Sequence, residues 1–110
     1  MQRQYRLKSS NAFKYIYKKG ETVSSSKLVL HFVKSNKGLK VGFSVSKAVG
    51  KSVVRNRVKR LLRENFRALI DRVDSGYSYI VSAKPQAAEM DFHELGRALE
   101  DLLNKAGKLR

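Results

Sequence analysis

The feature that most constrains this fold is an amphipathic helix predicted over residues 52–71, SVVRNRVKRLLRENFRALID. Its apolar residues recur at helical spacing and therefore line one side. This apolar side consists of Val54, Val58, Leu61, Leu62 and Leu69. Ser52 is expected to cap the start of the helix, and the amide of Asn65, on the apolar side, is expected to bond a backbone group. The apolar side must cover other apolar structure, and the surrounding segments predict a sheet.

Three segments around this helix have the side-chain pattern of β-strands. Residues 27–34 alternate, with one face formed by Leu28, Leu30 and Phe32 and the other by Val29, His31 and Val33. Residues 41–46 alternate in the same way, with Val41, Phe43 and Val45 on one face and Gly42, Ser44 and Ser46 on the other. Residues 77–83 are rich in aromatic and β-branched residues, which favours a strand. A short extra strand is expected near residues 21–26.

Two further helices complete the predicted order of elements. Residues 9–18 are expected to form a short first helix, because polar residues that cap helices precede apolar residues at helical spacing. Asp91 and Glu94 have the spacing of a capping box at the start of a last helix. Gly107 is expected to end that helix.

These elements predict one domain over residues 1–110, with a hydrophobic content of 42% that suffices for one modest core. We expect an α+β sandwich, in which a small mixed sheet has helices packed on one face. The order along the chain is helix, strand, strand, helix, strand, helix, plus the short extra strand. No stretch approaches the roughly 18 apolar residues of a membrane span, and the absence of cysteine agrees with a reducing compartment, so we expect a cytoplasmic protein.

The charge of the chain indicates a polyanionic partner. Lys and Arg number 24 against nine Asp and Glu, which gives a net charge of +15. Residues 47–64 hold seven basic side chains, and no acidic residue appears among them before Glu64. A face that only kept the protein soluble would mix both signs in helical pairs, so this pattern favours nucleic-acid binding.

The basic residues of the long helix are predicted to form a row on the side opposite the apolar one. This row comprises Asn56, Arg60, Arg63 and Arg67, flanked by Arg55, Lys59 and Arg57. Guanidinium groups suit phosphate oxygens because they offer paired donors. Lys47 and Lys51 bracket Gly50 just before the helix, where the free N–H groups of the helix start are expected to add an anion site.

The outer face of the sheet predicts a second binding surface. Register could place the small residues Gly42, Ser44 and Ser46 beside the second face of strand 27–34, which would leave a shallow channel. Phe13 and Tyr17, one turn apart on the first helix, would wall it. Bases of a single strand stack on such rings at about 1–3 kcal/mol each. An ordinary core role for Phe13 and Tyr17, and a strand role without special duty for His31, stay open at this point.

No catalytic or metal-binding residue is predicted in the chain itself. The nine acidic residues are scattered, whereas a metal-dependent nuclease needs clustered carboxylates. His31 and His93 are the only histidines, and nothing in the sequence places them together. Binding is therefore the expected work of this protein.

Three stretches carry a resemblance to a known family. VGFSVSKAVGKSVVRNRVKRLLRE, RLKSSNAFKYIYKKG and YSYIVSAKP resemble the bacterial ribonuclease P protein component, whose RNR motif matches Arg55, Asn56 and Arg57. The resemblance implies a ribosomal-protein-like fold with a left-handed βαβ crossover. It also implies that an RNA subunit performs a magnesium-dependent hydrolysis, while the protein binds the single-stranded 5′ leader of precursor transfer RNA. The implied assembly has one protein per RNA, a monomer in isolation, with no cofactor bound by the protein.

Residue roles are carried over by position within this resemblance. The leader site would comprise Phe13, Tyr17, Val29, His31 and Ser44, joined by Arg55 and Lys59. The site for the catalytic RNA would comprise Lys47, Lys51, Arg55, Asn56, Arg57, Lys59, Arg60 and Arg63. His31 stands where an aromatic residue is expected, and Ala48 stands where relatives often carry a second basic residue.

Three other functions would share part of this sequence pattern. A ribosomal-type RNA-binding protein would share the charge but would not need an aromatic channel for a single strand. A DNA-binding regulator would place more polar base-reading residues among the arginines than Asn56 alone. A membrane-surface helix would usually carry bulky aromatic residues at its apolar boundary, and this chain has no Trp.

Overall fold

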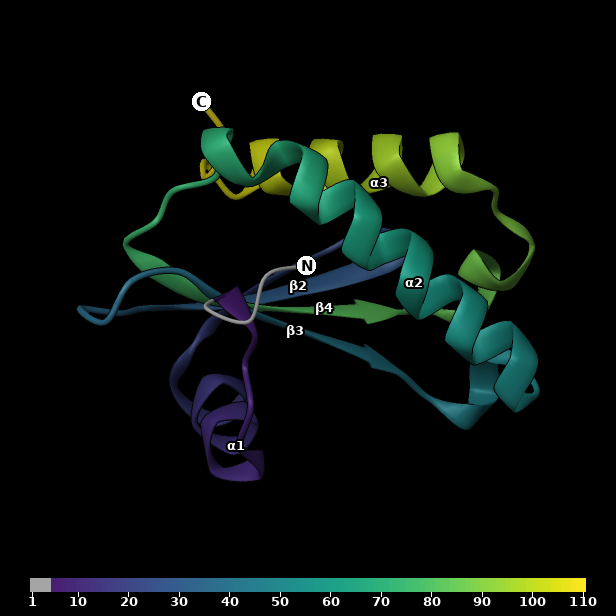
Figure 1. Cartoon of the computed structure of the whole chain (residues 1–110), viewed down its shortest axis with the longest axis horizontal. Coiled ribbons are helices and arrows are strands. Elements are labelled where there is room, and N and C mark those ends of the chain that lie inside the picture. Colours follow the sequence, from purple (N-terminus) through teal and green to yellow (C-terminus); the bar gives the residue numbers. More distant parts are fainter. Residues whose placement is uncertain (1–4) are drawn as a thin grey trace.

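The structure, a computed structural model, describes residues 5–110 and contains a four-stranded sheet within them (Figure 1). The strands are β1 (Glu21–Ser24), β2 (Leu28–Lys34), β3 (Lys40–Val45) and β4 (Tyr77–Ala83). The α-helices are α1 (Ser10–Lys19), α2 (Ser52–Leu69) and α3 (Phe92–Lys105). Short 3₁₀ helices are η2 (Lys47–Val49), η3 (Ile70–Arg72) and η4 (Pro85–Glu89).

The sheet is mixed, with the strand order β1-β2-β4-β3. β2 pairs antiparallel with β1 and with β4, whereas β3 pairs parallel with β4. The parallel pair is joined through α2, so the chain contains a βαβ unit. This architecture confirms the predicted α+β class, the mixed sheet and the extra strand before residue 27.

The helices lie on both faces of the sheet. α2 and α3 cover one face, and α1 lies against the other (Figure 1). The expectation that the helices pack on one face is therefore right for the two long helices and wrong for α1. The physical reason is that the second face also carries apolar residues. Ile80 of β4 and Ile16 of α1 are 0% and 2% exposed, outside the main core.

The main core lies between the sheet and the pair α2 and α3. Leu28, Leu30 and Phe32 of β2 are buried there, as their alternation predicts. The ring of Phe66 on α2 lies 6.0 Å from the rings of both Phe43 and Tyr79, measured between centroids. These aromatic contacts between helix and strands fix α2 over β3 and β4.

The predicted role of Asn65 is confirmed. Its side-chain Nδ2 donates to the backbone carbonyl of Leu61 at 2.9 Å and to that of Phe92 at 3.0 Å. A Cβ atom at Gly96 would lie 2.4 Å from Asn65 Oδ1, so only glycine leaves room for this amide. One polar side chain in the core thus ties α2 to the start of α3.

The helix ends agree with the sequence predictions except at α2. The Ser9 side chain accepts a hydrogen bond from the N–H of Ala12, and Asp91 and Glu94 form the predicted capping box. Gly107, with a φ of 72°, follows the end of α3, as expected. Ser52 does not cap α2: Lys51 occupies that position, without a side-chain hydrogen bond.

Candidate nucleic-acid interface

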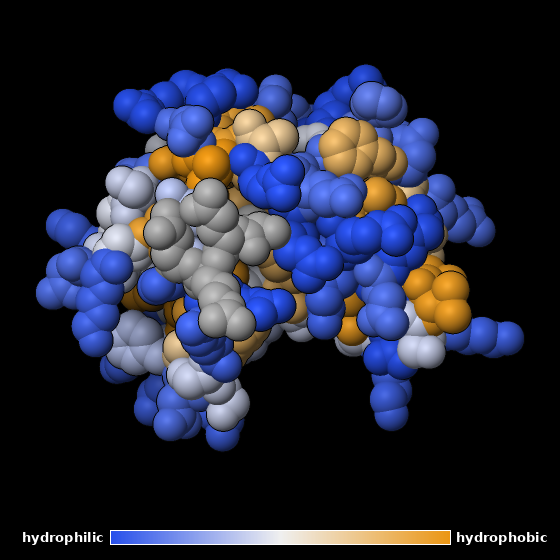
Figure 2. All heavy atoms as spheres, in the orientation of Figure 1, coloured by the Kyte–Doolittle hydropathy of each residue, from blue (hydrophilic) through white to orange (hydrophobic). Residues whose placement is uncertain are grey.

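The outward side of α2 forms the basic face, defined as Asn56, Lys59, Arg60, Arg63 and Arg67. All of these side chains are exposed except that of Arg63, which is half-buried. Figure 2 shows hydrophilic side chains gathered over α2. The predicted row is therefore present as a surface that phosphate groups can reach.

Two arginines beside this face make hydrogen bonds within the protein. Arg57 Nη1 donates to the carbonyl of Met90 at 3.2 Å, and Arg57 Nη2 donates to the carbonyl of Ala88. Arg55 Nε donates to the carbonyl of Gly50 at 3.1 Å. Both side chains are half-buried. Arg57 thus joins α2 to the segment before α3, and Arg55 supports the turn before α2.

The start of α2 has the features expected of an anion site. Gly50 has a φ of 154°, which favours glycine, and it follows η2 directly. Lys47 and Lys51 are exposed on either side of it. No acidic residue lies in the first turn of α2. The helix dipole and the two lysines therefore act in the same direction there.

On the opposite face of the sheet, α1 covers one row of residues across the strands. Thr22 pairs with His31, His31 with Ile80, and Ile80 with Gly42. A Cβ atom at Gly42 would lie 2.4 Å from the ring of Phe13, so this ring packs directly over the strand. Only glycine allows that approach.

Tyr17 and His31 come together on this face as predicted. Their ring centroids lie 4.8 Å apart, with an angle of 80° between the ring planes. The side chain of Tyr17 remains 46% exposed. Burial lowers the pKa of His31 below its usual value, so the ring is neutral at pH 7. The α1 side of the sheet thus presents an accessible aromatic ring beside a neutral imidazole.

A second row on this face lies beyond α1 and is only partly covered. Val29 pairs with Ser82, and Ser82 pairs with Ser44, and all three are half-buried. Strand alternation places them on the face that α1 occupies. Figure 2 shows the molecule hollowed beside α1 on this side of the sheet.

The predicted neighbours of β2 in the channel need correction. Gly42 and Ser44 do not lie beside β2, because β4 runs between β2 and β3. Ser82 therefore belongs to the channel, whereas Ile80 is buried between His31 and Gly42, and the prediction missed both. Alternation within residues 77–83 already places Ile80 and Ser82 on one face of that strand. Their position between β2 and β3 follows only when β4 is known to be a central strand.

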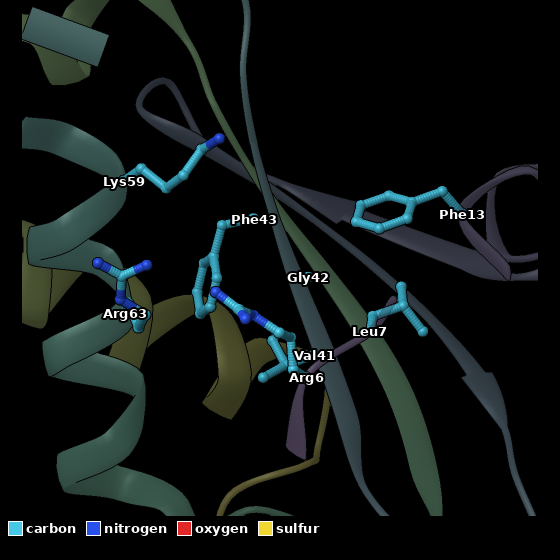
Figure 3. A pocket seen from close by; sticks show the side chains of 8 residues that line it. All are labelled: Arg6, Leu7, Phe13, Val41, Gly42, Phe43, Lys59 and Arg63. Carbon is cyan, nitrogen blue, oxygen red and sulfur yellow. The ribbon is translucent and has the colours of Figure 1, made fainter. Parts of the chain in front are cut away.

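The two surfaces meet at a cavity of about 480 Å³ around the edge strand β3 (Figure 3). Lys59 and Arg63 approach it from α2, and Phe13 and Leu7 lie on the other side of the strand. The full lining comprises Arg6, Leu7, Phe13, Val41, Gly42, Phe43, Lys59 and Arg63. Basic and aromatic residues from opposite faces of the sheet thus share one opening.

Arg6 and Leu7 at this cavity were not predicted. The N–H of Leu7 donates to the carbonyl of Val41 at 3.0 Å, so the segment before α1 pairs with β3. Of the two α2 residues predicted for the leader site, Lys59 lines the same cavity as Phe13, whereas Arg55 does not line it. A pairing this short has no alternation that sequence reasoning could use.

Two kinds of site are absent from the part of the chain that the structure describes. Within residues 5–110, no helix is long and apolar enough to cross a membrane. Over the same residues, no three histidine, aspartate or glutamate side chains gather in a way that could hold a metal ion.

Comparison with known proteins decides the family. The family model described as Ribonuclease P matches residues 1–107. The chain belongs to the ribonuclease P protein family. Its role is that of a protein subunit of a bacterial ribonuclease P, and the process it serves is transfer RNA processing. The sequence resemblance is thereby confirmed.

Relatives and solved structures agree with this assignment over almost the whole chain. The ribonuclease P protein component of Caldanaerobacter subterraneus is 46% identical over 103 residues, covering 91% of this chain and 87% of the relative. That of Symbiobacterium thermophilum is 43% identical, covering 100% and 97%. The RNase P protein of Staphylococcus aureus superposes with a TM-score of 0.89 at 32% identity, covering 96% of this chain and 98% of that one.

Proposed function

We propose that the chain binds two RNAs within ribonuclease P: the catalytic RNA subunit and the single-stranded 5′ leader of precursor transfer RNA. The RNA subunit performs the magnesium-dependent hydrolysis, and the protein contributes no catalytic group. The working unit has one protein per RNA, and the free protein is a monomer in the cytoplasm.

The observation that carries this proposal is the continuity of the two surfaces around β3. The basic face of α2 neutralises phosphates without reading sequence. The channel on the other face offers the ring of Tyr17 beside His31 and a floor of small side chains, which suits unstacked bases. Lys59 and Phe13 line one cavity between these surfaces. A single strand of RNA can therefore run from the channel to α2 while it stays in contact with the protein surface.

The two RNAs take different parts of the surface in this proposal. The leader occupies the channel at Phe13, Tyr17, Val29, His31 and Ser44, with the cations of Lys59 and Arg55 at its border. The RNA subunit contacts the start of α2 and its basic face through Lys47, Lys51, Asn56, Arg60 and Arg63. Arg57 contributes its charge beside this face while its hydrogen bonds hold η4.

The experiment that tests the proposal is reconstitution with a bacterial ribonuclease P RNA at low magnesium concentration. Cleavage of precursor transfer RNA is measured with the RNA alone, the protein alone and both together. We expect no cleavage by the protein alone, stimulation of the RNA by the protein, and an affinity gain that disappears with a leaderless substrate. An RNA that is indifferent to the protein would contradict the proposal, and a general RNA-binding role would then explain the surface better.

A further inference from the structure

Thr22 of β1 lies on the same face of the sheet as His31. It lies directly opposite His31 in the antiparallel pairing of β1 and β2. Thr22 Oγ1 lies 3.2 Å from His31 Nδ1, which is hydrogen-bond distance. Tyr17 contacts the same imidazole from α1. His31 is therefore held from two sides, by a hydroxyl at one nitrogen and by an aromatic ring.

A hydrogen bond at one ring nitrogen decides what the other can do. A neutral imidazole has one N–H donor and one acceptor, and the partner at one nitrogen sets which of them keeps the proton. Among residues 5–110, His31 is the side chain with which the Thr22 hydroxyl forms a hydrogen bond. If this hydroxyl donates to Nδ1, the proton resides on Nε2, which points away from Thr22.

The surroundings of His31 favour the neutral ring. Facing it are Thr22 from β1, Tyr17 from α1 and its cross-strand partner Ile80 from β4, none of them charged at neutral pH. Glu21 lies on the opposite face of β1 by strand alternation. Lys14 and Lys18 of α1 are exposed. Burial is the cause of the lowered pKa of His31.

We propose that Thr22 is a positioning residue that makes His31 a neutral hydrogen-bond donor in the leader channel. The Thr22 hydroxyl donates to Nδ1, and Nε2–H is offered to an acceptor atom of a leader nucleotide. This inference rests on the proposed function, because the ligand is the leader. In the opposite arrangement, Nδ1–H would donate to the Thr22 hydroxyl and Nε2 would present a lone pair to the leader. The phosphates of the leader offer only acceptors, so they could not bond that lone pair.

Binding to the reconstituted enzyme tests this role with two substitutions of similar size. Thr22→Val removes the hydroxyl but keeps the β-branched shape, and Thr22→Ser keeps the hydroxyl. We expect Thr22→Val to reduce the affinity for leader-bearing precursor by about 3- to 10-fold, the range of one hydrogen bond. Thr22→Ser should bind within about twofold of the unchanged protein, and no variant should alter binding of a leaderless substrate. The acceptor on the leader is either a base atom or a phosphate oxygen, and a leader with abasic nucleotides separates these two cases. With this leader the effect of Thr22→Val vanishes if the acceptor is a base atom and persists if it is a phosphate oxygen.

Nitrogen chemical shifts of the His31 ring give a readout that a purely structural role would not change. His93 is the only other histidine, so a His93→Gln background leaves a single ring to assign. We expect the proton on Nε2 in the unchanged protein and in Thr22→Ser, and a mixture of tautomers in Thr22→Val. The pKa of His31 should also rise in Thr22→Val, because the bond that favours the neutral ring is lost.

The outcomes separate this inference from the function on which it rests. A proton on Nδ1 in the unchanged protein, or a leader-dependent gain that Thr22→Val leaves intact, overturns the positioning role alone. An unchanged protein that shows no leader-dependent gain overturns the proposed function, and the role of Thr22 with it.

Discussion

At the scale of single residues, Gly42 sets how closely α1 approaches the sheet. A Cβ atom there would lie 2.4 Å from Cζ and 2.8 Å from Cε2 of Phe13. Gly42→Ala therefore forces the ring away from β3, and we expect the free energy of unfolding to fall by about 1–3 kcal/mol, as for other overpacked sites. Leader-dependent affinity should fall as well, because the displaced ring narrows the channel. Urea unfolding and binding to the reconstituted enzyme measure the two effects.

A double variant separates packing from recognition at this site. Gly42→Ala with Phe13→Leu relieves the contact, so stability should largely return while leader affinity stays low, since leucine offers no ring for stacking. Ser44→Ala, two residues along the same face of β3, adds no atom and serves as the matched control for stability. If Gly42→Ala and the double variant both bound the leader as tightly as the unchanged protein, Phe13 would not belong to the leader site.

At the scale of elements, Arg57 of α2 holds η4 and the start of α3 in position. Its guanidinium bonds two carbonyls of the segment before α3. Arg57→Met keeps the apolar stem but leaves both carbonyls without this donor, so we expect a loss of about 1.5–3 kcal/mol in the free energy of unfolding. Arg60→Met, on the exposed side of the same helix, should change it by less than about 0.5 kcal/mol. Equal losses, measured by urea unfolding, would show that Arg57 is not a tie between elements.

The elements themselves could be predicted because their signals are local. Alternation in β2 and helical spacing in α2 depend only on neighbouring residues, and the capping box of Asp91 and Glu94 spans four positions. The cap of α2 was misassigned because Lys51 and Ser52 are adjacent and either residue type can precede a helix, and helix ends are the least certain part of any such prediction.

What could not be predicted is non-local. Alternation shows that β2 has two faces, but it does not say that β4 lies between β2 and β3. Ser82 and Ile80 were missed for that reason. Leu7 was missed because its pairing with Val41 is a single contact of an extended segment. The structure brings Tyr17 beside His31 and Phe13 over Gly42, as the first-helix spacing and strand alternation predict, whereas the neighbours of these residues in the sheet were set by strand order.

At the scale of the whole molecule, the question is whether the charge of +15 acts as a diffuse cloud or through α2. Each phosphate that a cation neutralises contributes about 0.7–0.9 to the slope of log affinity against log salt. Arg60→Ala with Arg63→Ala should therefore weaken RNA binding and lower the slope by up to about 2. Lys34→Ala with Lys37→Ala removes the same charge from exposed positions at the end of β2 and in the following turn, distant from α2 (Figure 1).

This control pair should leave the slope within about 0.5 of the unchanged protein, because a diffuse field loses little when two of 24 cations are removed. Affinity for the RNA subunit is measured over a range of salt concentrations, with circular dichroism confirming that all variants fold. Equal slopes for both pairs would contradict an interface at α2. A decrease in slope for the Arg60 and Arg63 pair alone would mean that the fold concentrates RNA binding on one surface. Because α2 packs against the core through its apolar side, its basic side is left facing the RNA.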